Sequence, residues 1–157
     1  MSANERQIGG DHYKTEYEHW DLVLATGMGY LEGCATKYVA RWRKKGGVAD
    51  LDKALHYVEK LQENALFLVS QRALDYVETS SRVENEVNQF CAINRLAGFE
   101  RAVILRLANW NVDRLVDAHK RIAGWIRYTN EGGDLPDPEP VPLTEENHYG
   151  ERASKDN

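Results

Sequence analysis

The sequence predicts an all-α fold, in which two related helical hairpins form a bundle that includes one long helix. Residues 50–77 contain neither glycine nor proline, and their apolar residues recur every three or four positions, as in a helix packed along its length. Glycines and polar turn residues divide most of the remaining chain into shorter helical patterns. In addition, a stretch of the first hairpin recurs in the second.

Residues 1–19 are polar and contain Gly9-Gly10, so we expect an arm without regular structure. A short helix is predicted from Trp20 or Asp21 to Thr26, with glycine at its end. The next helix should run from about residue 31 to 45, because Arg43-Lys44-Lys45 suits the negative end of the helix dipole and two glycines follow.

Asp50 is a favourable N-cap for the long helix, which is predicted to reach about Val77. Its apolar seam comprises Leu51, Ala54, Val58, Leu61, Ala65 and Leu68. Ser81 to Glu84 has the pattern of a capping box and predicts a fourth helix that ends near Arg95. A fifth helix is expected over 98–110 and, after a turn at Asn111 and Asp113, a sixth to about residue 128.

These elements predict four regions: an arm (1–19), a first hairpin (20–80), a second hairpin (81–132) and an acidic tail (133–157). Residues 131–157 contain eight acidic and two basic residues and therefore carry a charge of −6. Since the whole chain carries −5, residues 1–130 sum to about +1. We expect the tail to be flexible. A nearly neutral folded part favours a small anionic ligand over long nucleic acid, which needs a broad basic face.

Several other protein classes are disfavoured. No apolar run approaches the roughly 20 residues of a membrane span, and the first residues lack a signal-peptide pattern. Cys34 and Cys91 lie in apolar helical patterns, as reduced core thiols of a cytoplasmic protein do. The five histidines show no metal-binding spacing, and a solvated helix face explains Glu59 and Glu63 better than a magnesium site. The four tryptophans are expected to be core or interface anchors.

The internal repeat aligns LEGCATKYVARW (31–42) with FERAVILRLANW (99–110), which places Trp42 on Trp110 and Glu32 on Glu100. The following turn is four residues shorter in the second copy. Any two amphipathic hairpins share apolar spacing, but the common Glu and Ala-x-Trp positions favour a duplication. The copies differ in polar residues, since Lys37, Arg41, Lys53 and Tyr57 align with Leu105, Asn109, Asp117 and Arg121.

The polar residues of the first copy form a candidate phosphate-binding cluster. Lys37, Arg41 and Lys44/Lys45 share one helix face, and Lys53 and Tyr57 share a face of the next helix. Arginine binds phosphate through a planar fork and lysine as a point charge. The alternative is a solvated basic helix end, which the spacing alone favours.

The arm supplies a second candidate, Gly9-Gly10-Asp11-His12-Tyr13-Lys14. A glycine pair lets backbone amides approach an anion, histidine can donate to a phosphate, and tyrosine can stack on a base. A flexible terminal turn is the alternative. No P-loop pattern G-x-x-x-x-G-K-[ST] occurs in the chain.

An ordered set of motifs over about residues 8–63 resembles a phage family of nucleotide kinase-like (SaV-like) domains, most of which have no known function. The matching positions are G-G-D-H-Y (9–13), W-D (20–21), Leu31-Glu32-Gly33, Lys37-Tyr38, Arg41, Lys44-Lys45 and D-L-x-K-A-x-x-Y-x-x-K-L (50–61). A characterised member is the deoxynucleoside-monophosphate kinase of short-tailed coliphages. Unlike that enzyme, this chain lacks a long N-terminal extension and has a second hairpin.

The resemblance implies a transferase of the host-cell cytoplasm that moves a phosphoryl group from a nucleoside triphosphate to a deoxynucleoside monophosphate. No tightly bound cofactor is implied beyond the nucleoside triphosphate as donor. A role for Mg²⁺ stays open, because the lysines and arginine could do work that is usually shared with magnesium. Carried onto this sequence, it implies Lys37, Arg41 and His12 as catalytic residues. The implied substrate-binding residues are Gly10, Asp11, Tyr13, Tyr38, Lys44, Lys45, Lys53 and Tyr57.

Three other functions remain open. The protein could bind nucleotides without turnover, as a sequestering or defence-countering module. It could be an all-α nucleotide pyrophosphatase, although no E-x-x-E followed by E-x-x-D is present. The heptad seam and acidic tail would also suit a structural or partner-binding phage protein. Apolar residues beyond the seam on the long helix predict a homo-oligomer, unless the second hairpin covers them.

Overall fold

The computed structural model describes residues 15–72, 79–96 and 98–133, and these contain helices but no strand. The prediction of an all-α fold is therefore confirmed. No helix in these ranges is both long and apolar enough to cross a membrane. The helices are α1 (His19–Thr26), α2 (Tyr30–Arg41), α3 (Val48–Arg72), α4 (Thr79–Ile93), α5 (Gly98–Ala108) and α6 (Val112–Asn130).

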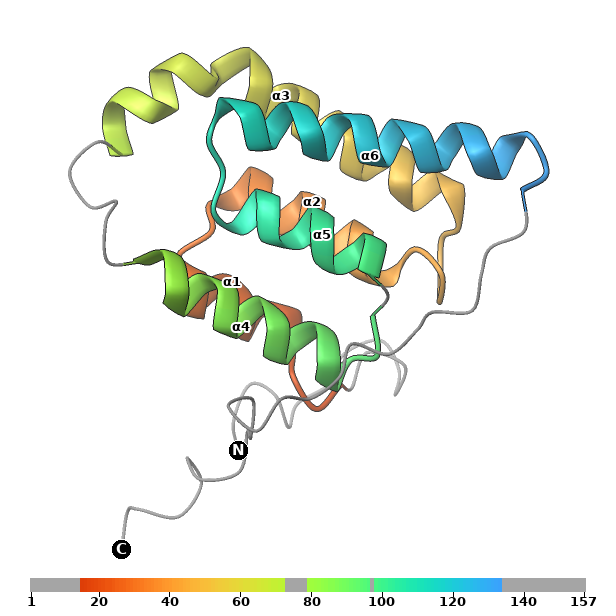
Figure 1. Ribbon diagram of the computed structural model, residues 1–157, viewed down its shortest axis with the longest axis horizontal. Helices are drawn as coiled ribbons and strands as arrows, with labels where there is room; N and C mark the ends of the chain where they lie inside the picture. The colour runs from red at the N-terminus through yellow and green to blue at the C-terminus, as the bar shows by residue number, and fades with distance from the viewer. Residues whose placement is uncertain (1–14, 73–78, 97, 134–157) are drawn as a thin grey trace, which may run out of the picture.

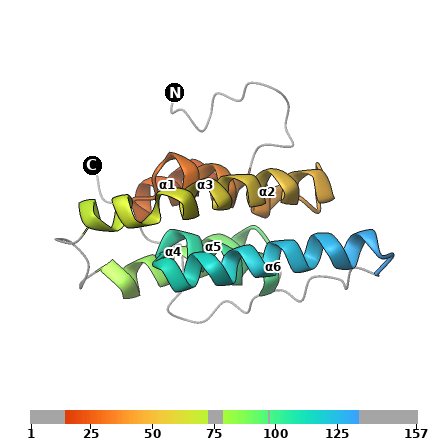
Figure 2. The ribbon, with the colours of Figure 1, turned by 90° about the horizontal axis from the view of Figure 1, so that it is seen from above.

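The helices form two layers, with α1, α2 and α3 in one and α4, α5 and α6 in the other (Figure 2). We refer to these layers as the first and second half. Across the boundary, α1 packs on α4, α2 on α5 and α3 on α6. Each helix thus contacts its own counterpart, as in two copies related by an approximate two-fold axis (Figure 1).

Burial follows the register of the repeat. The buried residues of α2 and α5 occupy the same four aligned positions, at a constant separation of 68 residues, as from Glu32 to Glu100. The aligned positions of α3 and α6 are buried as well. The pairs are Glu32/Glu100, Ala35/Val103, Thr36/Ile104, Val39/Leu107, Leu51/Leu115, Ala54/Ala118 and Val58/Ile122.

The repeat also extends upstream, into α1 and α4. Gly27 ends α1 with a φ of 69°, and 68 residues later Arg95 follows α4 with a φ of 55°. Both turns close with the same hydrogen bond. Met28 N–H donates to Val23 O (3.2 Å), and Leu96 N–H donates to Cys91 O (2.9 Å). Glycine adopts this left-handed conformation freely, whereas arginine does not. Backbone geometry is therefore shared where side chains have diverged.

The predicted end of the second helix is wrong by four residues, because α2 ends at Arg41. The N–H groups of Lys44 and Lys45 both donate to the Arg41 carbonyl, and Gly47 N–H donates to Trp42 O at 2.7 Å. These bonds close a turn in which Gly47 has a φ of 55°. The basic residues therefore lie in the connection between α2 and α3.

Two predicted N-caps are also wrong. Helix α3 begins at Val48, so Asp50 lies in its first turn, where its buried carboxylate binds cations. Helix α4 begins at Thr79, which places Ser81 inside the helix. The predicted turn lies at Asn111, whose side chain caps α6 by accepting the N–H of Arg114 at 2.8 Å, whereas Asp113 lies inside the helix.

Most of the predicted core is present in the described residues. Trp42 and Trp110 are buried, Trp125 packs against the core, and Trp20 is about half exposed, at 47%. Cys91 is buried and Cys34 is half-buried, and both are free thiols. Burial raises the pKa of Cys91 to about 12. The arm up to residue 14, the predicted helix end at 73–77 and the tail from 134 lie outside the described residues.

Candidate functional site

A polar and aromatic cluster lies where α2 and α3 meet at their connecting turn. We call it the α2–α3 cluster; it comprises Tyr38, Arg41, Asp50, Lys53 and Tyr57. The first two residues come from the last turns of α2, and the other three from the first three turns of α3. Helices α2 and α3 pack along each other, which brings these turns together.

Asp50 is the centre of this cluster and is only 1% exposed. Arg41 donates from Nε to Oδ2 (2.9 Å) and from Nη2 to Oδ1 (3.3 Å), and Lys53 Nζ donates to Oδ1 (3.1 Å). Burial raises the pKa of Asp50, but hydrogen bonds and charges from both cations outweigh burial and hold the pKa below its usual range. The two cations are thereby fixed side by side.

Gly46 makes room for this buried carboxylate. A Cβ atom placed on Gly46 would overlap the carboxyl group of Asp50. The turn before α3 therefore needs glycine at this position for steric reasons, while Gly47 meets the separate requirement of a positive φ.

Two tyrosines stack beside the cations. The rings of Tyr38 and Tyr57 are 5.9 Å apart between centroids and 16° from parallel. Above the Tyr38 ring lie Arg41 Cζ, 4.7 Å from the centroid, and Lys53 Nζ, 5.3 Å from it. Tyr30, which is 76% exposed, meets Tyr57 edge-on at 6.3 Å. Planar aromatic surface thus adjoins positive charge, a combination suited to a base and a phosphate.

The hydroxyl of Tyr57 has two polar neighbours. The charge interaction with Cys34 is the largest cause that raises the pKa of Tyr57 to about 12, and hydrogen bonds with Tyr30 and Cys34 add to it. The phenol therefore remains protonated at neutral pH and can act as a hydrogen-bond donor.

The structure brings together four of the predicted site residues, namely Tyr38, Arg41, Lys53 and Tyr57. It places Lys37 elsewhere: no hydrogen bond or ion pair of the described residues joins it to the cluster, and its charge acts on His19. The pKa of His19 is lowered to about 4, mainly by burial of the ring and to a smaller extent by the charge of Lys37. Lys44 donates to the carbonyl of Asn94 (3.3 Å) in the second half.

Lys45 is exposed in the turn, and Gly10, Asp11, His12 and Tyr13 lie outside the described residues. Sequence reasoning missed the ionic role of Asp50, because a carboxylate at a helix start also reads as a cap. It also missed Tyr30 and Cys34. A signal was present, since Tyr30, Cys34, Tyr38 and Arg41 follow the spacing of a helix face.

The second half has a different polar cluster at the aligned place. Asp117 binds Arg106 and also Arg121, the latter at 2.8 Å. Neither arginine is matched by a basic residue, because their counterparts are Tyr38 and Tyr57. Within the described residues, no group of three or more histidine, cysteine or acidic side chains could hold a metal ion.

Comparison with known proteins gives one family. Its sequence model, described as a protein of unknown function (DUF3310), matches residues 9–59. The match includes every residue of the α2–α3 cluster and stops before the second half. No curated protein and no solved structure matches the chain.

Proposed function

We propose that the protein binds a nucleotide at the α2–α3 cluster, with its phosphate on Arg41 and Lys53. The observation that supports this most directly is the pair of cations fixed by buried Asp50 beside stacked tyrosines. The aligned place in the second half has no aromatic residue. Since apolar packing needs only the shared frame, the additional residues of the first half require another role.

The charges of the cluster suit one phosphate group. Arg41 and Lys53 outnumber Asp50, so one net positive charge remains. The side chain of Arg41 is 26% exposed and that of Lys53 is 52% exposed, which leaves both accessible to a ligand. Charge-assisted hydrogen bonds from such groups contribute about 1.5–3 kcal/mol each.

The reaction that we propose for this site is phosphoryl transfer to a deoxynucleoside monophosphate. A phosphate oxygen of the acceptor attacks the γ-phosphorus of a nucleoside triphosphate, and the bond to the bridging oxygen breaks. Two nucleoside diphosphates result, and Mg²⁺ enters as part of the donor substrate. Such a reaction depends on positioning and on stabilisation of negative oxygens, which Arg41 and Lys53 can supply. The support is the resemblance over residues 8–63.

Binding without turnover is the second candidate. It is favoured by the contacts of Asp50, which hold both cations in place through three hydrogen bonds. Cations fixed in this way serve stable capture of a phosphate as well as transfer.

Calorimetry with deoxynucleoside monophosphates and nucleoside triphosphates tests binding. Lys53→Ala, which leaves the Arg41–Asp50 pair intact, and Arg41→Ala should each weaken binding by about tenfold or more. Lys60→Ala is the matched control, because Lys60 is exposed on the same helix and pairs with Glu63 at the surface. Unchanged affinity in both folded cluster variants would contradict the proposal, and a turnover assay with mixed nucleotides separates the kinase from the binding module.

A further inference from the structure

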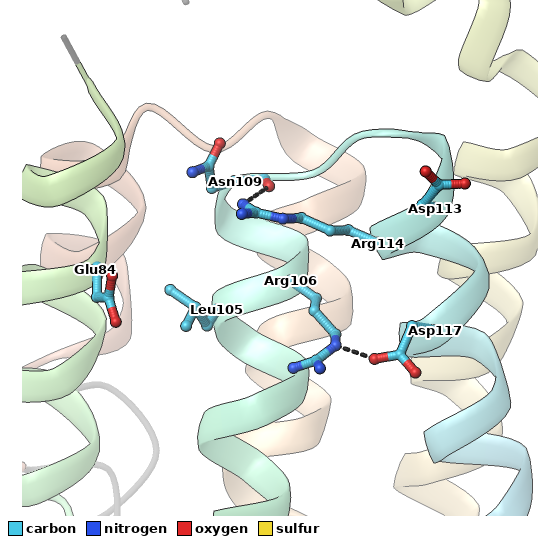
Figure 3. A pocket seen from close by; sticks show the side chains of 7 residues that line it. All are labelled: Glu84, Leu105, Arg106, Asn109, Asp113, Arg114 and Asp117. Carbon is cyan, nitrogen blue, oxygen red and sulfur yellow. Dashed lines mark hydrogen bonds and ion pairs between the residues drawn. The ribbon is translucent and has the colours of Figure 1, made fainter. Parts of the chain in front are cut away.

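The second half contains a pocket of about 400 Å³ between α4, α5 and α6 (Figure 3). It lies at the place that corresponds to the α2–α3 cluster, since Asn109 and Asp117 align with Arg41 and Lys53. The lining residues are Glu84, Leu105, Arg106, Asn109, Asp113, Arg114 and Asp117.

We propose that this pocket is a second binding site, which takes a phosphate group through Arg106 and Arg114. The group can belong to free inorganic phosphate or to a small phosphomonoester. This site is separate from the nucleotide site of the first half and does not depend on it.

The two guanidinium groups reach the pocket from different helices. Arg114 extends from the first turn of α6 and donates from Nη1 to the Asn109 carbonyl at 2.7 Å. Arg106 extends from α5, binds Asp117 through Nε and donates from Nη1 to the carbonyl of Ala102 at 2.8 Å. Figure 3 shows both side chains between α5 and α6. Among the described residues, the remaining N–H groups of both arginines have no acceptor, so they can receive a ligand.

The carboxylates at the pocket are largely balanced. Asp117 is bound by two arginines, and Glu84 lies 3.9 Å from Arg101. Asp113 is exposed at the start of α6. The lining residues themselves comprise two arginines and three carboxylates, a sum of −1. Arg101 and Arg121 pair with Glu84 and Asp117 from outside the lining and bring the sum to +1.

A single phosphate fits this setting better than a longer polyanion does. One net positive charge with two planar forks suits a compact oxyanion, because a guanidinium group binds phosphate through two parallel bonds. The volume lies at the small end of the range for small-molecule sites. Half-buried Leu105 supplies an apolar wall for the remainder of a phosphomonoester.

NMR of the arginine Nε–Hε groups tests the proposal in the full chain. Inorganic phosphate, a nucleoside monophosphate and the parent nucleoside are titrated separately. We expect saturable shifts of Arg106 and Arg114 with phosphate, with the monophosphate or with both, and none with the nucleoside. Saturation by phosphate identifies the free anion as a sufficient ligand, whereas saturation by the monophosphate alone identifies an ester.

Arg114→Ala should weaken this binding by about tenfold or more. Arg127→Ala, an exposed substitution in the last turn of α6, should leave the binding unchanged. Arg106→Lys keeps a cation for Asp117 but removes the planar fork, so it should also weaken binding. The proposal would be overturned if the wild-type protein showed no saturable shifts. It would also be overturned if folded Arg114→Ala and Arg106→Lys bound phosphate as tightly as the wild type. Arg41→Ala should leave these shifts intact, which separates this test from that of the nucleotide site.

Discussion

The indole N–H of Trp42 donates a hydrogen bond of 2.6 Å to Oε1 of Glu100 in the other half of the chain. The aligned residues form the same bond in the opposite direction, from Trp110 to Oε1 of Glu32 at 2.6 Å. Such crossed pairs characterise a two-fold interface, here contained in one chain. The halves are nevertheless not interchangeable, because small buried side chains in one align with larger ones in the other, as Ala35 and its counterpart Val103 illustrate.

Trp42→Phe should lower the free energy of unfolding by about 1–3 kcal/mol, because a buried carboxylate loses a donor. Glu100 would retain Arg43, which donates to the same oxygen at 2.6 Å. Trp110→Phe should cause a loss of similar size. Urea unfolding followed by circular dichroism measures both, with Trp20→Phe as the control because Trp20 lies outside the buried core. A loss no greater than that of the control would show that the crossed bonds contribute little to stability.

The apolar frame could be predicted because burial imposes a helical period, and Leu51, Ala54 and Val58 indeed lie in the core. The crossed bonds could not, because spacing along the chain does not reveal which buried carboxylate a distant indole reaches. Residue spacing placed Lys37 and Arg41 on one face, but helix packing directs them differently: Arg41 meets Asp50, and Lys37 lies near His19.

The repeat predicted that the two halves correspond, yet sequence alone underestimated its extent. The turns at Gly27 and Arg95 share a conformation without sharing a residue type. Arg41, Lys53 and Tyr57 were expected to lie together, and they do. This could be predicted because these polar residues differ between two copies that share an apolar frame. Their ionic partner was misread, since a cap and a buried counter-ion look alike in sequence.

Gly46→Ala should destabilise the protein by about 1–3 kcal/mol, because the added methyl group overlaps the carboxyl group of Asp50. Displacement of that carboxylate should also weaken nucleotide binding at Arg41. Gly98→Ala is the matched control, since a Cβ atom at Gly98 meets nothing within 4 Å. Thermal unfolding and calorimetry of the two variants provide the comparison, and equal stability would show that the turn relaxes without cost.

Asp50 should contribute stability that is lost in acid. Its folded-state pKa lies below the usual value, so the contribution is present above about pH 4, the ordinary pKa of an unfolded aspartate. As the pH falls through the folded-state pKa, the carboxylate takes up a proton and the contribution disappears. The stability difference between wild type and Asp50→Asn should therefore shrink on acidification. Urea unfolding over a pH series measures it, with exposed Asp52→Asn as the control.

Lys37→Gln should raise the pKa of His19 above its value of about 4, because a nearby positive charge is removed. The pKa should stay below 6.5, since burial is the larger cause of the shift. NMR titration of the His19 ring protons measures the change directly. An unaltered pKa in the variant would show that Lys37 does not act on this ring. Lys37 would then be available to contact a ligand.

A homo-oligomer remains a prediction, but the structure restricts its interface. The heptad seam of α3 is buried inside the chain, where Ala54 and Leu61 lie in the core and α3 packs on α6. The C-terminal part of α3 extends beyond α6 (Figure 1). There Leu66 is 84% exposed, and Phe67 and Val69 are 65% and 43% exposed. The seam is therefore not available for association, and we propose this projecting end of α3 as the interface of an oligomer.

Leu66→Lys combined with Val69→Lys should convert an oligomer into a monomer without loss of helix content, because neither residue belongs to the buried core. Light scattering over a dilution series measures the mass of wild type and variant, and circular dichroism checks the fold. Leu24→Lys serves as the control, since Leu24 is 80% exposed on α1 and far from α3 in sequence. A wild-type mass near 17.9 kDa at every concentration would rule out the oligomer, and both proposed ligand sites would then belong to one chain.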